Sequence, residues 1–187
     1  MSKWDTETAE WYAEKYGEYA TNKLGIGTLK LEVDSTVIDI GCGTGCALRH
    51  ASMQVSNGTL IGIDPIPRMI EIARKQTARH SAGDRITYLE GSAENLPVES
   101  ASADIALAFD SYDHWQDQVK GLKEVRRVLK SNGRFVVVKD GGLPNGTDSQ
   151  KEFVAALINA GFKIIEEKNI EENDVTLTQW VCAVRST

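Results

Sequence analysis

The stretch that decides the fold is Val37-Ile38-Asp39-Ile40-Gly41-Cys42-Gly43-Thr44-Gly45, a short apolar run followed by three glycines at alternate positions. A continuous β-branched run of this length is typical of a buried parallel strand. Glycines let the backbone turn tightly and let a ligand approach it closely, and a following helix offers free N–H groups. One glycine would suffice for a turn, so three favour a ligand-binding loop.

Apolar β-branched runs alternate with segments of helical period along the rest of the chain, which predicts βαβ units and a parallel sheet. Further parallel strands are expected at 59–63, 85–89, 104–109 and 134–139. Two last runs, 162–170 and 175–185, are joined by a short polar turn and should pair antiparallel. The sequence therefore predicts the α/β class: a Rossmann-like three-layer α/β/α sandwich with a mostly parallel seven-stranded sheet and an antiparallel C-terminal hairpin.

The 187 residues fit a single domain. We expect residues 36–187 to form the ligand-binding core and residues 1–30 to form a helical lid segment. One helix is predicted from Thr6 to Thr21, and it carries four aromatic residues, Trp11, Tyr12, Tyr16 and Tyr19. These rings either pack on the sheet edge or cover the bound ligand, with a tyrosine hydroxyl touching it.

Composition excludes several classes of function. The formal net charge of −6, without a compensating basic patch, disfavours nucleic acid as a partner. No stretch approaches the ~18 apolar residues of a membrane span, and Met1 to Glu10 has no apolar run typical of a secretory signal. Three cysteines, an odd number, favour a reducing compartment, so we expect a cytoplasmic protein. Cys42 and Cys46 lack the further ligands of a metal site.

The glycine loop is compatible with two kinds of adenosine cofactor. A dinucleotide site requires G-x-G-x-x-G, and here Cys46 occupies the position of the last glycine. With Asp39, the loop instead has the form D-x-G-x-G-x-G. It resembles the first motif of the class I S-adenosylmethionine-dependent methyltransferases.

A second segment agrees with this resemblance. Asp64 ends the predicted strand 59–63, where a carboxylate can accept the hydrogen bonds of both ribose hydroxyls of either cofactor. The alternative role of Asp64 is a helix N-cap. The residues that follow, 65–73, are similar to the helix that follows this acid in the methyltransferases.

Two more segments resemble the same family. Leu89 to Pro97 is similar to G-D-A-E-x-L-P, the segment that passes the adenine edge, but Ser92 replaces the aspartate. A serine hydroxyl can still accept the adenine amino proton, without the strength that a charge adds. Residues 124–134 are similar to E-x-x-R-V-L-K-P-G-G, with Ser131 and Asn132 replacing proline and glycine. Four motifs in the correct order extend the resemblance from about Thr36 to Lys139.

The resemblance implies an enzyme that transfers the methyl group of S-adenosyl-L-methionine to a small-molecule acceptor. It implies that the cofactor is bound by residues of these motifs, together with a tyrosine of the lid segment: Asp39, Gly41, Cys42, Gly43, Gly45, Asp64, Pro65, Met69, Ser92, Ala93, Glu94, Phe109 and Tyr16.

Ligands of doubly wound sheets lie beyond the carboxyl ends of the strands, so residues 110–115, and 140–142 on the same edge, should lie near the transferred methyl group. His114 can act as a general base or can merely support the loop. Asp110 is a second catalytic candidate, or a solvated loop acid. The loop lacks the D/N-P-P-Y motif, which disfavours methylation of bases in DNA.

Several alternatives remain open at this point. The chain could be a catalytically silent S-adenosylmethionine-binding subunit that supports a partner protein, a protein-modifying methyltransferase, or, less in keeping with Cys46, a nicotinamide-dependent oxidoreductase. Little inserted sequence is available to cover a substrate. Either the N-terminal helix closes the site, or a second subunit does so in a homodimer, or the acceptor is itself large.

Overall fold

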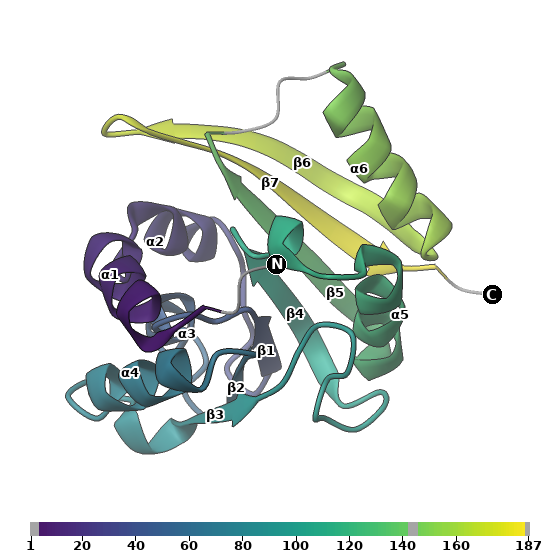
Figure 1. Ribbon diagram of the computed structural model, residues 1–187. Helices are drawn as coiled ribbons and strands as arrows, with labels where there is room; N and C mark the ends of the chain where they lie inside the picture. The colour runs from purple at the N-terminus through teal and green to yellow at the C-terminus, as the bar shows by residue number, and fades with distance from the viewer. Residues whose placement is uncertain (1–3, 142–145, 186–187) are drawn as a thin grey trace.

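The computed structural model describes residues 4–141 and 146–185 and contains one seven-stranded sheet with the order β3-β2-β1-β4-β5-β7-β6 (Figure 1). The strands are β1 Thr36–Ile40, β2 Thr59–Asp64, β3 Ile86–Glu90, β4 Ala103–Phe109, β5 Leu129–Asp140, β6 Phe162–Glu172 and β7 Val175–Val184. The helices are α1 Thr6–Tyr16, α2 Ala20–Gly27, α3 Cys46–Ala51, α4 Pro67–Thr77, α5 Gln118–Val128 and α6 Asp148–Asn159, with short 3-10 turns η1 Gly83–Arg85 and η2 Tyr112–His114. Residues 1–3 of the predicted lid segment, Gly142, and residues 186–187 lie outside the described residues.

The strand pairing confirms the predicted topology. β1 pairs in parallel with β2 on one side and β4 on the other, so that Asp39 is in register with Gly62 and with Leu107. The order of the sheet reverses at β1, which makes the carboxyl end of this strand a topological switch point, where α/β proteins bind their ligands. β7 runs antiparallel to both of its neighbours, β5 and β6, as expected for the terminal hairpin.

Two apolar cores, one on each face of the sheet, complete the three layers. Successive residues of β1 point to opposite faces: Val37 packs into a core with residues of α2, α3 and α4, and Ile38 packs into the other core with residues of α5 and α6. Figure 1 shows the two groups of helices on either side of the sheet. Within the described residues, no helix is both long enough and apolar enough to cross a membrane.

The N-terminal helix differs from the prediction of a single helix from Thr6 to Thr21. α1 ends at Tyr16, and α2 begins only at Ala20. The carbonyl of Gly17 accepts a hydrogen bond from Thr44 Oγ1 at 2.5 Å, so the chain bends toward the glycine loop. A Cβ at Gly17 would lie 2.9 Å from the Thr44 methyl group, and a larger residue would therefore separate the two segments. Tertiary contact, which helical periodicity does not encode, divides the helix.

β5 also begins earlier than the predicted strand 134–139. Leu129 pairs with Ala103, and the register of β4 against β5 then shifts before Ile105 pairs with Arg134. The polar residues 131–133, typical of a turn, lie in this irregular part of the strand.

We expect a change of volume at Gly25 in α2 to lower stability. A Cβ there would lie 2.7 Å from Phe109 Cε2 and 3.1 Å from Val138 Cγ2, at the ends of β4 and β5. Gly25→Ala should lower the free energy of unfolding by about 1–3 kcal/mol through overpacking. Gly27→Ala is the matched control, because no atom lies within 4 Å of its added methyl group. It should raise stability by up to about 1 kcal/mol. Equal urea midpoints for the two variants would contradict the packing of α2 on the sheet.

Candidate active site

Three glycines shape the loop between β1 and α3. Gly41, Gly43 and Gly45 all have a positive φ. A Cβ at Gly45 would lie 2.0 Å from Tyr88 Oη, so this glycine is needed for the approach of the loop to β3. At Gly43 no atom lies within 4 Å of the position of a Cβ. The loop is thus packed tightly at its end and open at its centre, where a ligand can approach the backbone.

Two buried carboxylates flank this open part of the loop. Asp39 is 2% exposed, and its Oδ1 has no hydrogen-bond partner within the described residues. Asp64 is 6% exposed, and its two oxygens accept hydrogen bonds from Gly43 N at 3.0 Å and Ile66 N at 2.9 Å. Burial and the charge of Asp64 raise the pKa of Asp39 to about 7. Burial raises the pKa of Asp64 to about 6, against the effect of its two backbone hydrogen bonds.

The alternative role of Asp64 as a helix cap is wrong. The N-cap of α4 is Ile66, which makes no side-chain capping bond, and Pro67 begins the helix. Asp64 instead holds Gly43 and the start of the β2–α4 connection. Each of its oxygens retains a further lone pair for a ligand.

The other residues predicted to bind the cofactor near this loop differ in exposure. Cys42 and Met69 are buried, and Pro65 is exposed. Cys42 belongs to the core that contains α3, and a Cβ at Gly62 would lie 2.9 Å from its sulfur. Met69 of α4 packs against Ala9 and Ala13 of α1, and it therefore helps to hold α1 against α4.

The segment after β3 is tied to α5. Glu94 Oε1 accepts a hydrogen bond from Asp117 N at 3.0 Å, and Asp117 is the N-cap of α5. Ala93 is buried and Ser92 is half-buried beside it. The carboxylate of Glu94 therefore holds the loop that presents Ser92 and Ala93.

The end of β4 carries a strained acidic residue. Asp110 has a φ of 52°, in the left-handed region that costs a non-glycine residue about 1 kcal/mol or more. Its oxygens accept hydrogen bonds from Asp140 N at 2.6 Å and Thr21 Oγ1 at 2.9 Å. Burial raises the pKa of Asp110, while these two hydrogen bonds lower it. Phe109, the preceding residue, is buried against α2.

His114 ends the 3-10 turn that follows Asp110. Its backbone N–H donates to Ser111 O at 2.9 Å, but its side chain is exposed and makes no hydrogen bond or ion pair within the described residues. The loop is braced by other groups: Ser111 Oγ donates to Ile40 O, and Lys139 pairs with Asp113 at 2.7 Å. The imidazole is therefore free of polar partners among the described residues and is available to a ligand.

The N-terminal segment covers the same edge of the sheet. Tyr19 Oη donates to Asp140 Oδ2 at 2.7 Å, and Tyr16 packs between the rings of Tyr12 and Tyr19. Burial and nearby negative charges, those of Asp110, Asp64 and Asp140 among them, raise the pKa of Tyr12. The contacts of Tyr19 and Thr21 cannot be predicted from the sequence, because no local pattern relates these residues to acids more than eighty positions away.

Hollows on the surface of the described residues include two of interest. One, of about 170 Å³, lies at the ends of β4 and β5 and is lined by residues 110–113 and 138–140. A larger one, of about 330 Å³, lies between Glu10 of α1 and the outer side of α4, lined mostly by charged side chains. Only the first adjoins the residues described above. No group of three or more potential metal ligands is found among the described residues.

Comparison with known proteins identifies the class. The model of the methyltransferase domain family matches residues 38–137. A ubiquinone/menaquinone biosynthesis C-methyltransferase of Citrifermentans bemidjiense is 32% identical over 126 residues, which cover 67% of this chain and 52% of that protein. The chain thus spans about half the length of this relative and of two other curated relatives that it matches.

Solved structures show the same fold. A putative methyltransferase in complex with the Trm112 methyltransferase activator of Haloferax volcanii has a TM-score of 0.81 and 21% identity, with 95% of this chain and 96% of that chain covered. An S-adenosylmethionine-dependent methyltransferase from Aquifex aeolicus has a TM-score of 0.77 and 19% identity, with 97% and 100% covered.

The family model covers most of β1, the glycine loop and the switch point of the sheet. This chain belongs to the methyltransferase domain family, as a class I S-adenosylmethionine-dependent member.

The residues present fit this cofactor. S-adenosylmethionine carries a sulfonium and an ammonium group, and its ribose offers two hydroxyl donors. The unpartnered, buried Oδ1 of Asp39 and the carboxylate of Asp64 supply negative charge and acceptors beside the open backbone at Gly43.

The buried acids predict a dependence of stability on pH in the ligand-free protein. Asp39 and Asp64 bind protons more tightly in the folded chain than in the unfolded chain, where both titrate near 3.8. The free energy of unfolding should therefore fall as pH rises from about 4 to about 7. Asp39→Asn should remove part of this slope and stabilise the protein at pH 8 by up to about 4 kcal/mol. Urea unfolding at pH 5 and pH 8 measures both effects, with the exposed Asp34→Asn as control. A variant with the slope of the parent would contradict a perturbed Asp39.

Proposed function

We propose that this chain transfers the methyl group of S-adenosylmethionine to a small-molecule acceptor. The observation that carries the proposal is the pair of buried carboxylates, Asp39 and Asp64, beside the open backbone of Gly43 at the switch point of the sheet. Burying two acids together without a cation is costly, and it is expected where a positively charged ligand is bound.

Each part of the site has a proposed role in binding the cofactor. Asp64 accepts the ribose hydroxyls, and Asp39 supports the loop and supplies negative charge. Ser92 and the backbone of Ala93 contact the adenine, and Glu94 holds that segment against α5. Tyr16 covers the amino acid moiety from the N-terminal side. The remaining predicted residues line or support the glycine loop and its surroundings: Gly41, Cys42, Gly45, Pro65, Met69 and Phe109.

The cofactor supplies an electrophilic methyl group on its sulfonium. The protein must then align the acceptor and, where the acceptor carries a proton, remove it. His114 is the proposed base, because its imidazole is exposed and free of protein hydrogen bonds at the end of β4 within the described residues. Asp110 faces the same edge, and its oxygens already accept two hydrogen bonds, so it orients the loop and adds negative charge.

The dimensions of the site favour a small acceptor. The hollow at the ends of β4 and β5 has a volume of about 170 Å³. Tyr19 of the N-terminal segment donates a hydrogen bond to Asp140, which lines this hollow. The name of the bacterial relative, a ubiquinone/menaquinone biosynthesis C-methyltransferase, agrees with a small-molecule acceptor.

Cofactor preference tests the proposal directly. S-adenosylmethionine and S-adenosylhomocysteine should raise the melting temperature, and NAD should not. At 100 times the dissociation constant the stabilisation should be about 2.7 kcal/mol. Asp64→Ala should weaken binding by about 1.5–3 kcal/mol, the range for a hydrogen bond to a charged group, while Asp84→Ala, which removes an exposed acid, should not. Stabilisation by NAD alone would refute the proposed cofactor.

The role of His114 is tested by truncation. His114→Ala should leave the affinity for S-adenosylhomocysteine nearly unchanged and lower kcat by about 10²–10⁴-fold if the imidazole removes a proton. His80→Ala serves as the control. Near-normal turnover in His114→Ala would exclude it as the base and would indicate an acceptor that reacts without one.

A further inference from the structure

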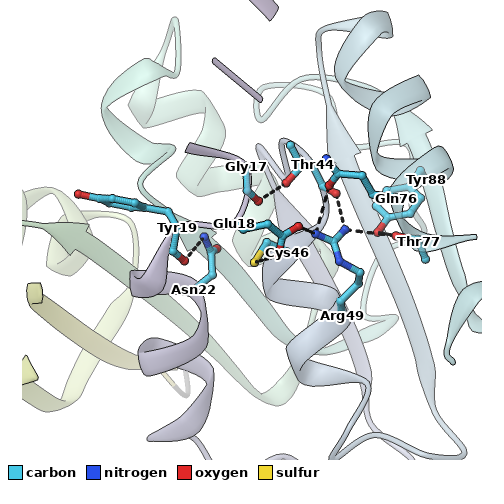
Figure 2. A network of polar contacts seen from close by, with 10 residues as sticks. All are labelled: Gly17, Glu18, Tyr19, Asn22, Thr44, Cys46, Arg49, Gln76, Thr77 and Tyr88. Atoms are coloured by element: carbon cyan, nitrogen blue, oxygen red, sulfur yellow. Dashed lines mark hydrogen bonds and ion pairs between the residues drawn. The ribbon is translucent and has the colours of Figure 1, made fainter. Parts of the chain in front are cut away.

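A network of polar contacts fastens the connection between α1 and α2 to the glycine loop (Figure 2). Two attachments do so. Thr44 Oγ1 donates to the carbonyl of Gly17, and the guanidinium of Arg49 pairs with the carboxylate of Glu18. Cys46 Sγ lies 3.4 Å from the second oxygen of Glu18. Residues 17–18 are therefore held by the loop residue Thr44 and by the first turns of α3.

Arg49 is a buried cation at the centre of this network. Only 8% of its side chain is exposed. The charged Arg49 is thus buried together with the apolar residues of α3. Its Nη1 donates to Thr44 O at 2.6 Å and to Thr77 Oγ1 at 3.4 Å, and its Nη2 donates to Gln76 Oε1 at 3.3 Å. Arg49 thus joins the glycine loop to the C-terminal end of α4 as well as to the N-terminal segment.

Glu18 neutralises this cation. Within the described residues it is the one carboxylate that forms an ion pair with Arg49. A buried charge without a partner is strongly unfavourable, so the arrangement of residues 17–18 depends on the pair. Glu18 itself is 65% exposed and can be changed without creating a cavity.

The connection held in this way carries the aromatic residues of the proposed site. Tyr16 immediately precedes Gly17, and Tyr19 immediately follows Glu18 and donates to Asp140. A displacement of residues 17–18 would move both tyrosines relative to the acids at the ends of β4 and β5. The same displacement would remove the Thr44 hydrogen bond, which is one of the contacts that hold the glycine loop.

We propose that Glu18 and Arg49 are positioning residues for S-adenosylmethionine, which set the glycine loop and the tyrosines of the N-terminal segment in one arrangement before the cofactor binds. This inference rests on the proposed function, because it assigns Tyr16 and the loop to cofactor binding. It differs from a direct contact of Glu18 with the cofactor, which would leave the ligand-free N-terminal segment unaffected by loss of the carboxylate. It also differs from a purely structural role, in which only the stability of the whole chain would change.

The first test compares Glu18→Gln with Glu14→Gln, which removes the same charge from an exposed position of α1. Glu18→Gln should weaken binding of S-adenosylhomocysteine, measured by calorimetry, by about 10-fold, the effect of losing one charge-assisted hydrogen bond. In the ligand-free protein, amide hydrogen exchange of residues 6–27 should increase by about 10-fold or more, while exchange in β1 and β4 stays near that of the parent. Glu14→Gln should match the parent in both measurements.

A second variant tests the other attachment. Thr44→Val preserves the shape of the side chain and removes the hydrogen bond to Gly17 O. It should increase exchange of residues 6–27 in the same way, without changing any charge. The double variant Glu18→Gln/Arg49→Gln should lose less binding free energy than the sum of the losses in the two single variants, because the two residues act as one pair.

The outcomes separate this inference from the proposed function. If the parent binds S-adenosylhomocysteine and Glu18→Gln matches it in affinity and exchange, the positioning role is wrong. Lower affinity with unchanged exchange of the ligand-free segment would also overturn it, in favour of a direct contact. A parent that binds no cofactor would refute the proposed function, whereas the exchange of residues 6–27 would still decide whether the pair holds the segment.

Discussion

Backbone hydrogen bonds attach the glycine loop to the carboxyl end of β2, and the rest of the site depends on this attachment. Gly41 N and Cys42 N both donate to Ile63 O, at 2.8 and 3.0 Å, and Gly43 N donates to the carboxylate of Asp64. The loop can come so close because β1 and β2 are parallel neighbours that end at the same edge. This geometry leaves the backbone at Gly43 open and directs two acids toward the same space.

Negative charge dominates this edge of the sheet. Asp39, Asp64 and Asp110 all have a pKa that burial raises, and Asp140 lies beside Asp110. Much of this charge is not neutralised by basic side chains, although Lys139 pairs with the neighbouring Asp113. Such a cluster lowers the stability of the ligand-free fold and raises the affinity for a cationic ligand, because electrostatic attraction is strong where water is excluded. The N-terminal segment adds hydroxyl donors from Tyr19 and Thr21.

Much of the fold could be predicted because it is encoded locally. The strand at residues 37–40 is apolar apart from Asp39, the glycines follow it directly, and the acid at Asp64 ends the next strand. Each of these signals lies within a few residues of the structure that it predicts. The structure differs from the sequence-based prediction where contacts between distant residues decide the conformation. Gly17 interrupts a segment of helical period because its carbonyl accepts a hydrogen bond from Thr44. β5 begins at Leu129 because that residue pairs with Ala103.

The sequence by itself determined the fold class, the family and the acids and glycines of the loop, because periodicity, turn chemistry and motif spacing are properties of neighbouring residues. Only the tertiary structure decided that Asp64 holds Gly43 rather than capping α4, and that Glu94 holds α5. It alone revealed Arg49 as a buried cation paired with Glu18, since an arginine in a short helix gives no local sign of burial. These contacts join residues 21 to 31 positions apart, and their energies depend on desolvation that only the assembled layers create.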